Sequence, residues 1–413
     1  MSWFLRMLLI VLPLLILTFG YVGSRLGAAI RTLSPLPHAA VRRAIVSVIS
    51  FLNIYLILLL VAQIFRWREF ITALRGGSEW GNFLAYPFWA GLILFGEVLP
   101  LFLFLDLARL PLWKIFQRYK QQWLKYQAWA SVILFASFAL YVGFRIAKDT
   151  FWPRLTQCEV RIAGLPEELD GFRIVHLSDL QADAYTDAKK MQRYIDLANA
   201  QKPDLVLFSG DLVTGGLDYI QAGAEMMGKL RARLGVYACQ GDHDYWSSRD
   251  MVAEALQRQG VHIYEDSVLA LSGSVSKISL TILTNVYQRR PSAETLHELS
   301  ERRPETAAHL ILTHQPSATV VEFAEKNGYD LVAAGHTHGG QVVFRFFGFP
   351  LNASMFETDY VSGFFQIGKT LLSVTNGLGL TIAPVRYQAP SEVTLLTLRR
   401  NWTAPTNHTN THE

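Results

Sequence analysis

The chain has 413 residues, which is more than one ordinary domain needs. Its charge is unevenly divided: residues 1–157 carry 16 Lys and Arg against 5 Asp and Glu, whereas residues 158–413 carry 22 against 29. The acidic second part has no basic aromatic face, which argues against nucleic-acid binding, and two cysteines are too few for a disulfide framework. A basic, apolar first part followed by an acidic part predicts a membrane region joined to a soluble domain.

Four apolar runs lie in the first part of the chain, near residues 4–22, 44–64, 83–105 and 128–144. Each is about long enough to cross a hydrocarbon core of ~30 Å as a helix. Aromatic residues lie near the ends of the runs, as membrane interfaces favour. We therefore expect a multi-pass transmembrane region over residues 1–157, with a retained first helix rather than a cleaved signal peptide because three more runs follow.

Basic residues in the loops indicate an orientation by a slim margin. Nine lie on the side of the loops that follow the first and third runs, against seven on the other side. Under the positive-inside rule this predicts a multi-pass protein of the cell membrane whose soluble domain lies outside the cytoplasm. Glu97 lies inside the third run, where a carboxylate is costly, and the sequence leaves open both a functional role and a protonated, helix-facing residue.

From Gly171 onward, short apolar runs alternate with helix-like stretches. The runs end in polar residues within HLSD, FSGD, QGDHD, LTHQ and AAGHTHGG. Between them the pattern predicts helices at residues 188–200, 219–233, 249–259, 293–301 and 318–326. This alternation predicts an α/β domain, in which the ends of the strands carry the functional site.

Each of five predicted strands delivers Asp or His side chains at the same edge, a convergence that independent surface residues rarely produce. Such a set suits two divalent cations, with Asp211 as the predicted bridging carboxylate because it is isolated after a glycine on a central strand. The sequence has no G-x-S-x-G elbow and no Walker phosphate loop. In chain order the candidate residues are Asp179, Gln181, Asp211, Asp242, His243, Asp244, His314, His336 and His338.

These blocks resemble a known family. HLSDLQ, FSGDLV, QGDHDY, LTHQP and AAGHTHGGQ are similar, in order, to the five signature blocks of the calcineurin-like metallophosphoesterases, and the likeness extends over about residues 172–398. The late part of the chain is similar to the membrane-anchored bacterial branch. The resemblance implies a β-sandwich flanked by helices (αββα) over residues 158–400, after an N-terminal bundle of about four transmembrane helices. A polar, disordered tail is expected at residues 401–413.

The resemblance also implies a role for each candidate residue. One metal ion would be held by Asp179, Gln181, Asp211 and His338, and the other by Asp211, Asp242, His314 and His336. His243 would act on the leaving-group oxygen, with Asp244 orienting its ring, and a metal-bound hydroxide would attack the phosphorus.

Two positions depart from the family pattern. Gln181 stands where the family usually has His, and Asp242 stands where it usually has Asn. Both residues offer oxygen donors, which favour Mn²⁺ or Mg²⁺ over Zn²⁺. We expect two divalent ions with a preference for manganese, and magnesium, iron and zinc remain alternatives.

The sequence thus predicts a membrane-anchored, dinuclear-metal-dependent phosphoesterase that hydrolyses a phosphate ester or a pyrophosphate. Because anchoring confines the site to the membrane plane, a lipid-linked substrate is a candidate. The resemblance implies the phospholipid or UDP-diacylglucosamine type, since branches of the family hydrolyse such molecules. The expected partners are the lipid bilayer and this substrate, without nucleic acid. Gln181 leaves open a metal-binding but catalytically weak sensor or scaffold at the membrane, and Glu97 leaves open a transporter. The sequence determines neither the substrate-binding residues nor the oligomeric state.

Overall fold

The computed structural model describes residues 3–271, 278–346 and 348–401 and divides into two compact units. The first unit comprises residues 1–148 together with Phe344–Pro350 and Ile382–Gln388. The second comprises Asp149–Val343, Leu351–Thr381 and Ala389–Glu413. Two short segments of the C-terminal half are therefore part of the N-terminal unit. The tail predicted at residues 401–413 lies outside the described residues except for Asn401.

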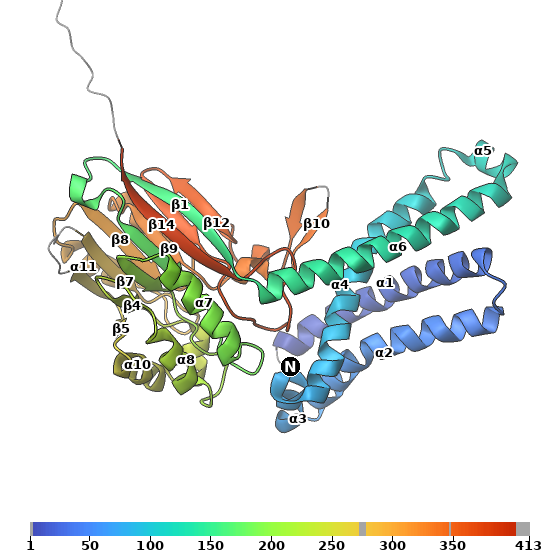
Figure 1. Ribbon diagram of the computed structural model, residues 1–413, viewed down its shortest axis with the longest axis horizontal. Helices are drawn as coiled ribbons and strands as arrows, with labels where there is room; N and C mark the ends of the chain where they lie inside the picture. Colours follow the sequence, from blue (N-terminus) through green and yellow to red (C-terminus); the bar gives the residue numbers. More distant parts are fainter. Residues whose placement is uncertain (1–2, 272–277, 347, 402–413) are drawn as a thin grey trace, which may run out of the picture. The chain divides into compact units, whose positions relative to one another are not determined.

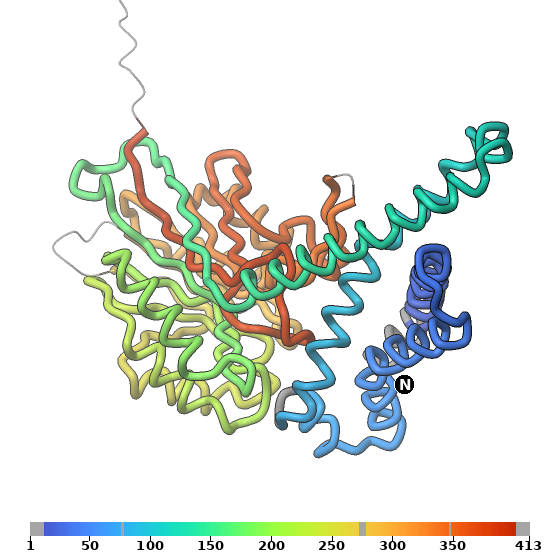
Figure 2. Tube along the Cα trace, turned by 45° about the vertical axis from the view of Figure 1, so that its right-hand side comes forward, coloured from blue at the N-terminus to red at the C-terminus, as the bar shows by residue number. Residues whose placement is uncertain are grey.

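The first unit is built on four long helices (Figures 1 and 2). They are α1 (Trp3–Leu33), α2 (His38–Ile64), α4 (Glu79–Leu107) and α6 (Lys120–Phe151), and the four predicted apolar runs lie within them. Shorter elements connect them: α3 (Arg68–Thr72), a π-helical turn (Ala73–Gly77) and α5 (Trp113–Arg118). By length and composition, each of the four long helices is able to cross a membrane.

Apolar side chains of α1, α2 and α4 pack together in this unit, with the rings of Phe19 and Phe95 stacked 4.5 Å apart. Glu97 of α4 is buried within it and accepts a hydrogen bond from the Tyr387 hydroxyl at 2.9 Å and a longer one from Gln388 at 3.4 Å. Next to it, Gly96 leaves room for the ring of Phe344, since a Cβ there would lie 2.7 Å from that ring. The two C-terminal segments thus complete the packing around α4.

The second unit contains two six-stranded sheets (Figure 1). The first has the order β1-β14-β2-β3-β4-β5, and the second has the order β12-β13-β9-β8-β7-β6. In the first sheet the strands are β1 (Arg154–Ile162), β14 (Glu392–Arg400), β2 (Arg173–Leu177), β3 (Leu205–Phe208), β4 (Val236–Ala238) and β5 (His262–Ile263). In the second they are β12 (Gly363–Ile367), β13 (Thr370–Val374), β9 (Leu331–Ala334), β8 (Ala308–Thr313), β7 (Ile278–Leu283) and β6 (Ser267–Ala270).

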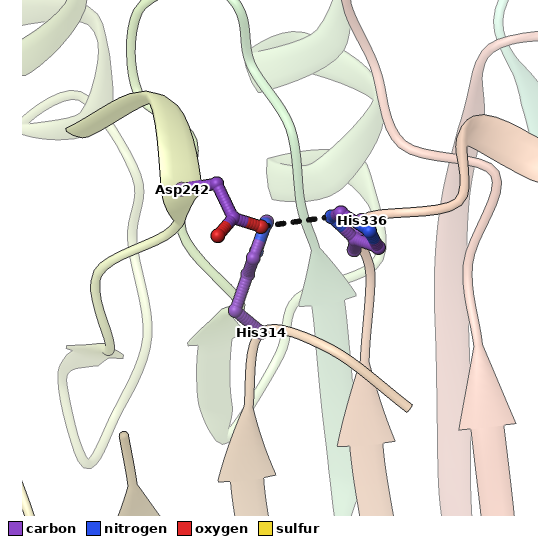
Figure 3. Close-up of side chains that lie close together, drawn as sticks. All are labelled: Asp242, His314 and His336. Carbon is purple, nitrogen blue, oxygen red and sulfur yellow. Dashed lines mark ion pairs between the residues drawn. The ribbon is translucent and has the colours of Figure 1, made fainter. Parts of the chain in front are cut away.

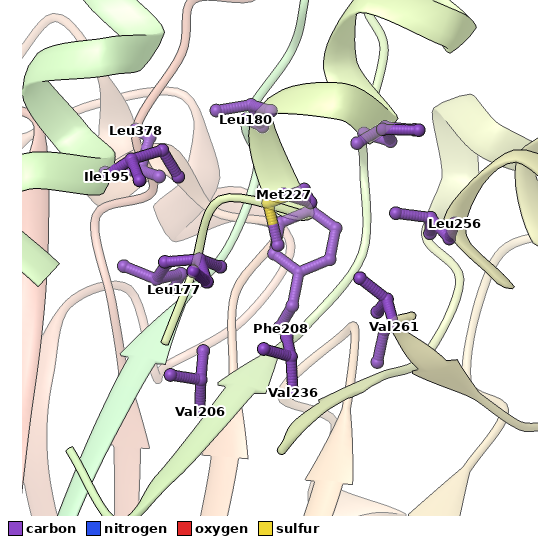
Figure 4. Close-up of a cluster of buried hydrophobic side chains, with 14 of the residues drawn as sticks. Leu177, Leu180, Ile195, Val206, Phe208, Met227, Val236, Leu256, Val261 and Leu378 are labelled. Carbon is purple, nitrogen blue, oxygen red and sulfur yellow. The ribbon is translucent and has the colours of Figure 1, made fainter. Parts of the chain in front are cut away.

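Successive side chains along a strand point to opposite faces of the sheet. Because the strands carry apolar residues on both faces, other elements cover each face. On β3, Val206 and Phe208 join a cluster with helices α7 (Ala188–Ala200), α8 (Ile220–Met227) and α10 (Arg249–Arg258), as Figure 4 shows. Leu205 and Leu207 on the same strand point to the other face and pack with residues of β7, β8 and β9. Helices α11 (Ala293–Glu301) and α12 (Ala318–Lys326) cover the outer face of the second sheet. The predicted β-sandwich flanked by helices is confirmed.

The predicted helices agree closely with α7, α10, α11 and α12, but the stretch predicted at residues 219–233 is helical over Ile220–Met227 alone. Gly228 follows directly and ends the helix. The remaining elements of this unit are short: turns at Glu167–Leu169, His338–Gly340 and Ser354–Phe356, and helix α9 (Asp242–Ser247). The hairpin of β10 (Phe344–Phe346) and β11 (Phe349–Leu351) belongs to the first unit except for Leu351. The boundary at residue 157 between the transmembrane region and the phosphoesterase domain stays a prediction.

The contact between Tyr387 and Glu97 yields a test of this packing. Replacing Tyr387 by Phe removes the shorter of the two hydrogen bonds to a buried carboxylate, and we expect the free energy of unfolding to fall by roughly 1–3 kcal/mol. Thermal unfolding of the full chain in detergent measures the loss. Tyr126→Phe is the control, because Tyr126 is 74% exposed. Equal melting temperatures for the two variants would contradict the expectation.

Candidate active site

The carboxyl ends of the parallel strands place the candidate residues. Strands β2, β3 and β4 run parallel in the first sheet, as do β7, β8 and β9 in the second. Asp179 and Asp211 follow β2 and β3, and Asp242 begins α9 after β4. From the second sheet, His314 follows β8, and His336 and His338 follow β9. Both sheets therefore contribute to one site, as expected at strand ends.

Within this site, six side chains form two groups whose ligand atoms lie within 4.8 Å of one another. One group is Asp242, His314 and His336, drawn in Figure 3. The other is Asp179, Asp211 and His338. The structure thus brings together all the Asp and His residues predicted as metal ligands. The two groups match the two implied ligand sets, except that Asp211, implied for both, belongs to the second group alone.

Distances within and between the groups are short. In the first, Asp242 Oδ2 lies 3.0 Å from His336 Nδ1 and 3.3 Å from His314 Nε2. In the second, Asp179 Oδ1 lies 3.3 Å from His338 Nε2. Asp211 connects the groups, since its Oδ2 lies 3.5 Å from His314 Nε2. This position between the groups agrees with a bridging carboxylate.

The backbone at the site adopts conformations that are rare for residues with side chains. Asp179, Gln181, Asp211, His336 and His338 all have φ between 50° and 71°. Such left-handed conformations cost of order 1–3 kcal/mol each and cluster at functional sites. Hydrogen bonds hold the loops in place, including one from Asp179 N to Gly210 O at 2.8 Å. The chain therefore maintains an unfavourable backbone in order to present these side chains together.

Electrostatics show how strongly the site attracts positive charge. Burial raises the pKa of Asp211 to about 7, and the charges of Asp179 and Asp242 act in the same direction. Burial lowers the pKa of His336, but hydrogen bonds to Asp242 and Glu357 outweigh it and raise that pKa to about 9. Carboxylates crowded out of water need compensating cations. Divalent metal ions would supply that compensation.

Gln181 agrees with a metal site although it departs from the family pattern. Its side chain is fully buried, and its amide nitrogen donates to Asp211 Oδ2 at 2.9 Å. The amide oxygen, buried beside the second group, has no hydrogen-bond partner in the described structure. Buried polar atoms normally have partners, so an oxygen donor without one fits a metal ligand.

His243 and Asp244 are at the site, but they do not interact as expected. His243 Nδ1 lies 2.6 Å from the carbonyl oxygen of Thr214, so this carbonyl, rather than Asp244, fixes the ring and leaves Nε2 available. The Asp244 carboxylate accepts hydrogen bonds from the backbone N–H groups of Gly241, Asp211 and Leu212. The predicted orienting role of Asp244 is therefore wrong: as the third residue of α9, it ties the loop of Asp211 to the start of that helix.

Sequence reasoning missed several residues around the first group, that of Asp242, His314 and His336. Gln315 donates from Nε2 to Asp242 Oδ2 at 2.5 Å, and Glu357 lies 3.0 Å from His336 Nε2. Tyr287 donates its backbone N–H to Asp242 Oδ1 at 2.6 Å and its hydroxyl to Glu357. Gln315 directly follows His314 within LTHQP and could have been found by its position, whereas Tyr287 and Glu357 lie in loops without a recognisable pattern.

Comparison with known proteins identifies the family. The family model described as calcineurin-like phosphoesterase matches residues 172–340. The metallophosphoesterase YkuE of Bacillus subtilis is 32% identical over 251 residues, which cover 59% of this chain and 85% of that protein. This chain belongs to the calcineurin-like metallophosphoesterase family. It is a phosphoester hydrolase.

Two further relatives of this metallophosphoesterase are covered to different extents. A transmembrane protein with metallophosphoesterase domain from Danio rerio is 27% identical over 285 residues, covering 65% of this chain and 62% of the relative. The phosphodiesterase YaeI of Escherichia coli is 25% identical over 242 residues, covering 58% of this chain and 86% of that protein. This chain therefore spans somewhat less than two thirds of the fish protein.

Close packing at Gly335 gives a test of the geometry. A Cβ at this position would lie 1.8 Å from Ser178 Oγ and 2.6 Å from Asp179 Oδ2. We expect Gly335→Ala to displace Asp179 and to lower both bound metal and hydrolytic rate at least tenfold in a folded protein. Metal analysis and an ester-hydrolysis assay measure this.

Gly215→Ala is the matched control, because a Cβ at Gly215 would meet nothing within 4 Å. Unchanged metal content in Gly335→Ala would contradict the described packing.

Proposed function

We propose that the chain is a membrane-anchored phosphoesterase that depends on two metal ions. The observation that carries this proposal is the arrangement of two ligand groups with Asp211 between them. Two cations a few ångströms apart suit a phosphoryl group, whose attacking and leaving oxygens they can clamp. The four long apolar helices support the anchoring.

In this proposal Asp179, Gln181, Asp211 and His338 hold one ion, and Asp211, Asp242, His314 and His336 hold the other. When bound, two divalent ions would polarise the phosphoryl oxygens and acidify a water molecule. Asp211 N–H donates to Asp244, and His314 Nδ1 lies 2.7 Å from Ser209 O, so the protein fixes these two ligands by hydrogen bonds on their far sides. We propose manganese as the preferred ion because Gln181 and Asp242 offer oxygen donors.

His243 is proposed to act on the leaving oxygen. Its Nδ1–H donates to the Thr214 carbonyl oxygen, so a proton given to the leaving oxygen would come from Nε2 of the doubly protonated ring. Its backbone N–H donates to Asp211 Oδ1 at 2.8 Å, which ties the position of the residue to the proposed bridging carboxylate. His243 therefore stands beside the metal groups without being one of their members.

The substrate is proposed to be carried by a membrane, as a lipid-linked phosphate ester or pyrophosphate. An anchored site meets such molecules at high local concentration because both are confined to one plane. The slim excess of basic residues in the loops after the first and third helices supports a phosphoesterase domain outside the cytoplasm.

The first test is metal-dependent turnover. Stripped full-length protein should take up two equivalents of metal and hydrolyse a chromogenic phosphate monoester or diester, with manganese restoring the highest rate. Asp211→Asn should lose both ions, and its hydrolytic rate should fall at least 10³-fold. Asp250→Asn, at an exposed position, should retain both ions and the full rate. Zinc as the best ion would refute the manganese preference. Two bound ions without any turnover would favour the sensor or scaffold suggested by Gln181.

The second test concerns His243. Proton transfer by a positioned side chain contributes typically ~10²–10⁴-fold, and an alkoxide leaving group needs it far more than nitrophenolate does. We expect His243→Ala to reduce hydrolysis of an alkyl phosphate ester by about 10²–10⁴-fold and that of a p-nitrophenyl ester much less. An equal reduction for both esters would show that His243 does not serve the leaving oxygen.

The third test concerns orientation. A C-terminal alkaline phosphatase fusion should be active in cells, and a C-terminal green fluorescent protein fusion exported through the general secretory route should be dark, because the proposed domain lies outside the cytoplasm. Fusions to the loop between α2 and α4 should behave in the same way, and fusions to the loop between α1 and α2 should behave in the opposite way. The reverse pattern would place the domain in the cytoplasm.

A further inference from the structure

A cavity of about 440 Å³ lies beside the group of Asp242, His314 and His336. His336 and Glu357 line it together with Asn285, Arg290 and Gln315. Its volume falls in the range of small-molecule sites. Because His336 belongs both to the cavity wall and to the candidate metal group, a substrate with its phosphoryl group at the metals would extend into this cavity.

Arg290 is held in the cavity wall by two neutral amides. Its Nη1 donates to Asn285 Oδ1 at 3.0 Å and to Gln315 Oε1. Both amides are buried, at 1% and 4% exposure, so their oxygens are well ordered acceptors. Among the described residues, no carboxylate forms an ion pair with Arg290. The guanidinium is thus positioned by hydrogen bonds while its charge remains available to a ligand.

The two amides are themselves fixed, which determines their orientation. Gln315 donates from Nε2 to the metal-group residue Asp242 at 2.5 Å, so its oxygen must face Arg290. Asn285 donates from Nδ2 to Gln315 O at 2.8 Å and to Ser317 Oγ at 3.0 Å, so its oxygen faces Arg290 as well. A continuous hydrogen-bonded path therefore leads from a candidate metal ligand to the guanidinium. This path sets where Arg290 lies relative to the reacting phosphoryl group.

Aromatic rings connect Arg290 with His243. The guanidinium carbon lies 5.4 Å from the centre of the Tyr287 ring, which stacks on Trp246 at 6.2 Å with an angle of 8°. The Trp246 ring in turn lies 4.7 Å from that of His243. Trp246 and Tyr287 are exposed by 58% and 49%, so a ligand can reach part of each side chain. The leaving part of a substrate would run from His243 along these rings toward Arg290.

Acidic residues near the cavity do not cancel this charge. Glu357 accepts the Tyr287 hydroxyl and pairs with His336, so its charge is already compensated. Asp359 also lines the cavity, but it is exposed and water screens it. Arg290 is therefore the ordered cation of the cavity wall.

Resting on the proposed phosphoesterase function, we propose that Arg290 binds a second anionic group, a phosphate or a carboxylate, on the leaving part of the substrate. The substrate class is then a phosphate ester or anhydride with two separated negative groups, rather than one whose leaving part is neutral. Arg290 is a specificity residue in this assignment and not a ligand of the reacting phosphoryl group.

The test uses two aryl phosphate esters that differ in one group on the leaving phenol, a carboxylate or a carboxamide. Metal-loaded full-length protein should show a kcat/KM about tenfold higher for the carboxylate ester, as one charge-assisted hydrogen bond provides. Arg290→Ala should abolish this preference and leave the carboxamide ester within twofold of its original rate. Arg290→Lys should retain part of the preference, and Arg302→Ala, at an exposed helix end, should retain all of it.

Two results would overturn the proposal: an unchanged preference in Arg290→Ala, or an equal loss for both esters, which would mean that Arg290 contacts the reacting phosphoryl group or supports the fold. Calorimetric binding of the matching arylphosphonates, which are not hydrolysed, needs no turnover. The carboxylate phosphonate should bind about tenfold more tightly than the carboxamide, and Arg290→Ala should remove the difference. Failure of wild-type turnover with this binding difference intact would refute the phosphoesterase function and leave the anion site standing.

Discussion

The structure of the phosphoesterase unit depends on how it compensates a group of buried carboxylates. Asp179, Asp211, Asp242 and Asp244 are nearly or fully inaccessible to water, and burial raises the pKa of Asp244, like that of Asp211, to about 7. Unpaired carboxylates in such surroundings would destabilise the fold. The protein meets this demand with imidazoles and backbone N–H groups, and the proposed pair of metal ions would complete it. Stability and catalysis therefore rest on the same charges.

The sequence predicted the fold and the main site because both follow from simple periodicities. Buried strands read as apolar runs, and the chemistry lies where each run ends, so Asp179, Asp211 and His314 could be found without any structure. Positive φ angles at the candidate ligands could not be found in this way. These angles are imposed by contacts between loops, such as the hydrogen bond from Gln181 N to Asp211 O, which join residues distant in sequence.

Residues that support the ligands were harder to predict. The family resemblance implied that Asp244 orients the ring of His243, but its carboxylate accepts hydrogen bonds from the backbone of another loop. Asn285 and Arg290 come from the segment after β7, a strand that ends without an Asp or His ligand and so gave no signal. They are linked to the site through the side-chain amide of Gln315. Its oxygen accepts a hydrogen bond from Arg290, and its nitrogen donates one to Asp242. Such connections are properties of the three-dimensional arrangement and leave no local pattern.

The membership of Phe344–Pro350 and Ile382–Gln388 in the helical unit has a consequence for biosynthesis. Chains emerge from the ribosome with the N-terminus first. Helix α4 is therefore made nearly three hundred residues before Tyr387, the donor that its buried Glu97 requires. During that interval Glu97 is without the Tyr387 hydroxyl and the Gln388 amide that it contacts in the finished structure. Synthesis of the segment Ile382–Gln388, rather than of the last long apolar helix, therefore completes the contacts of the helical unit around Glu97.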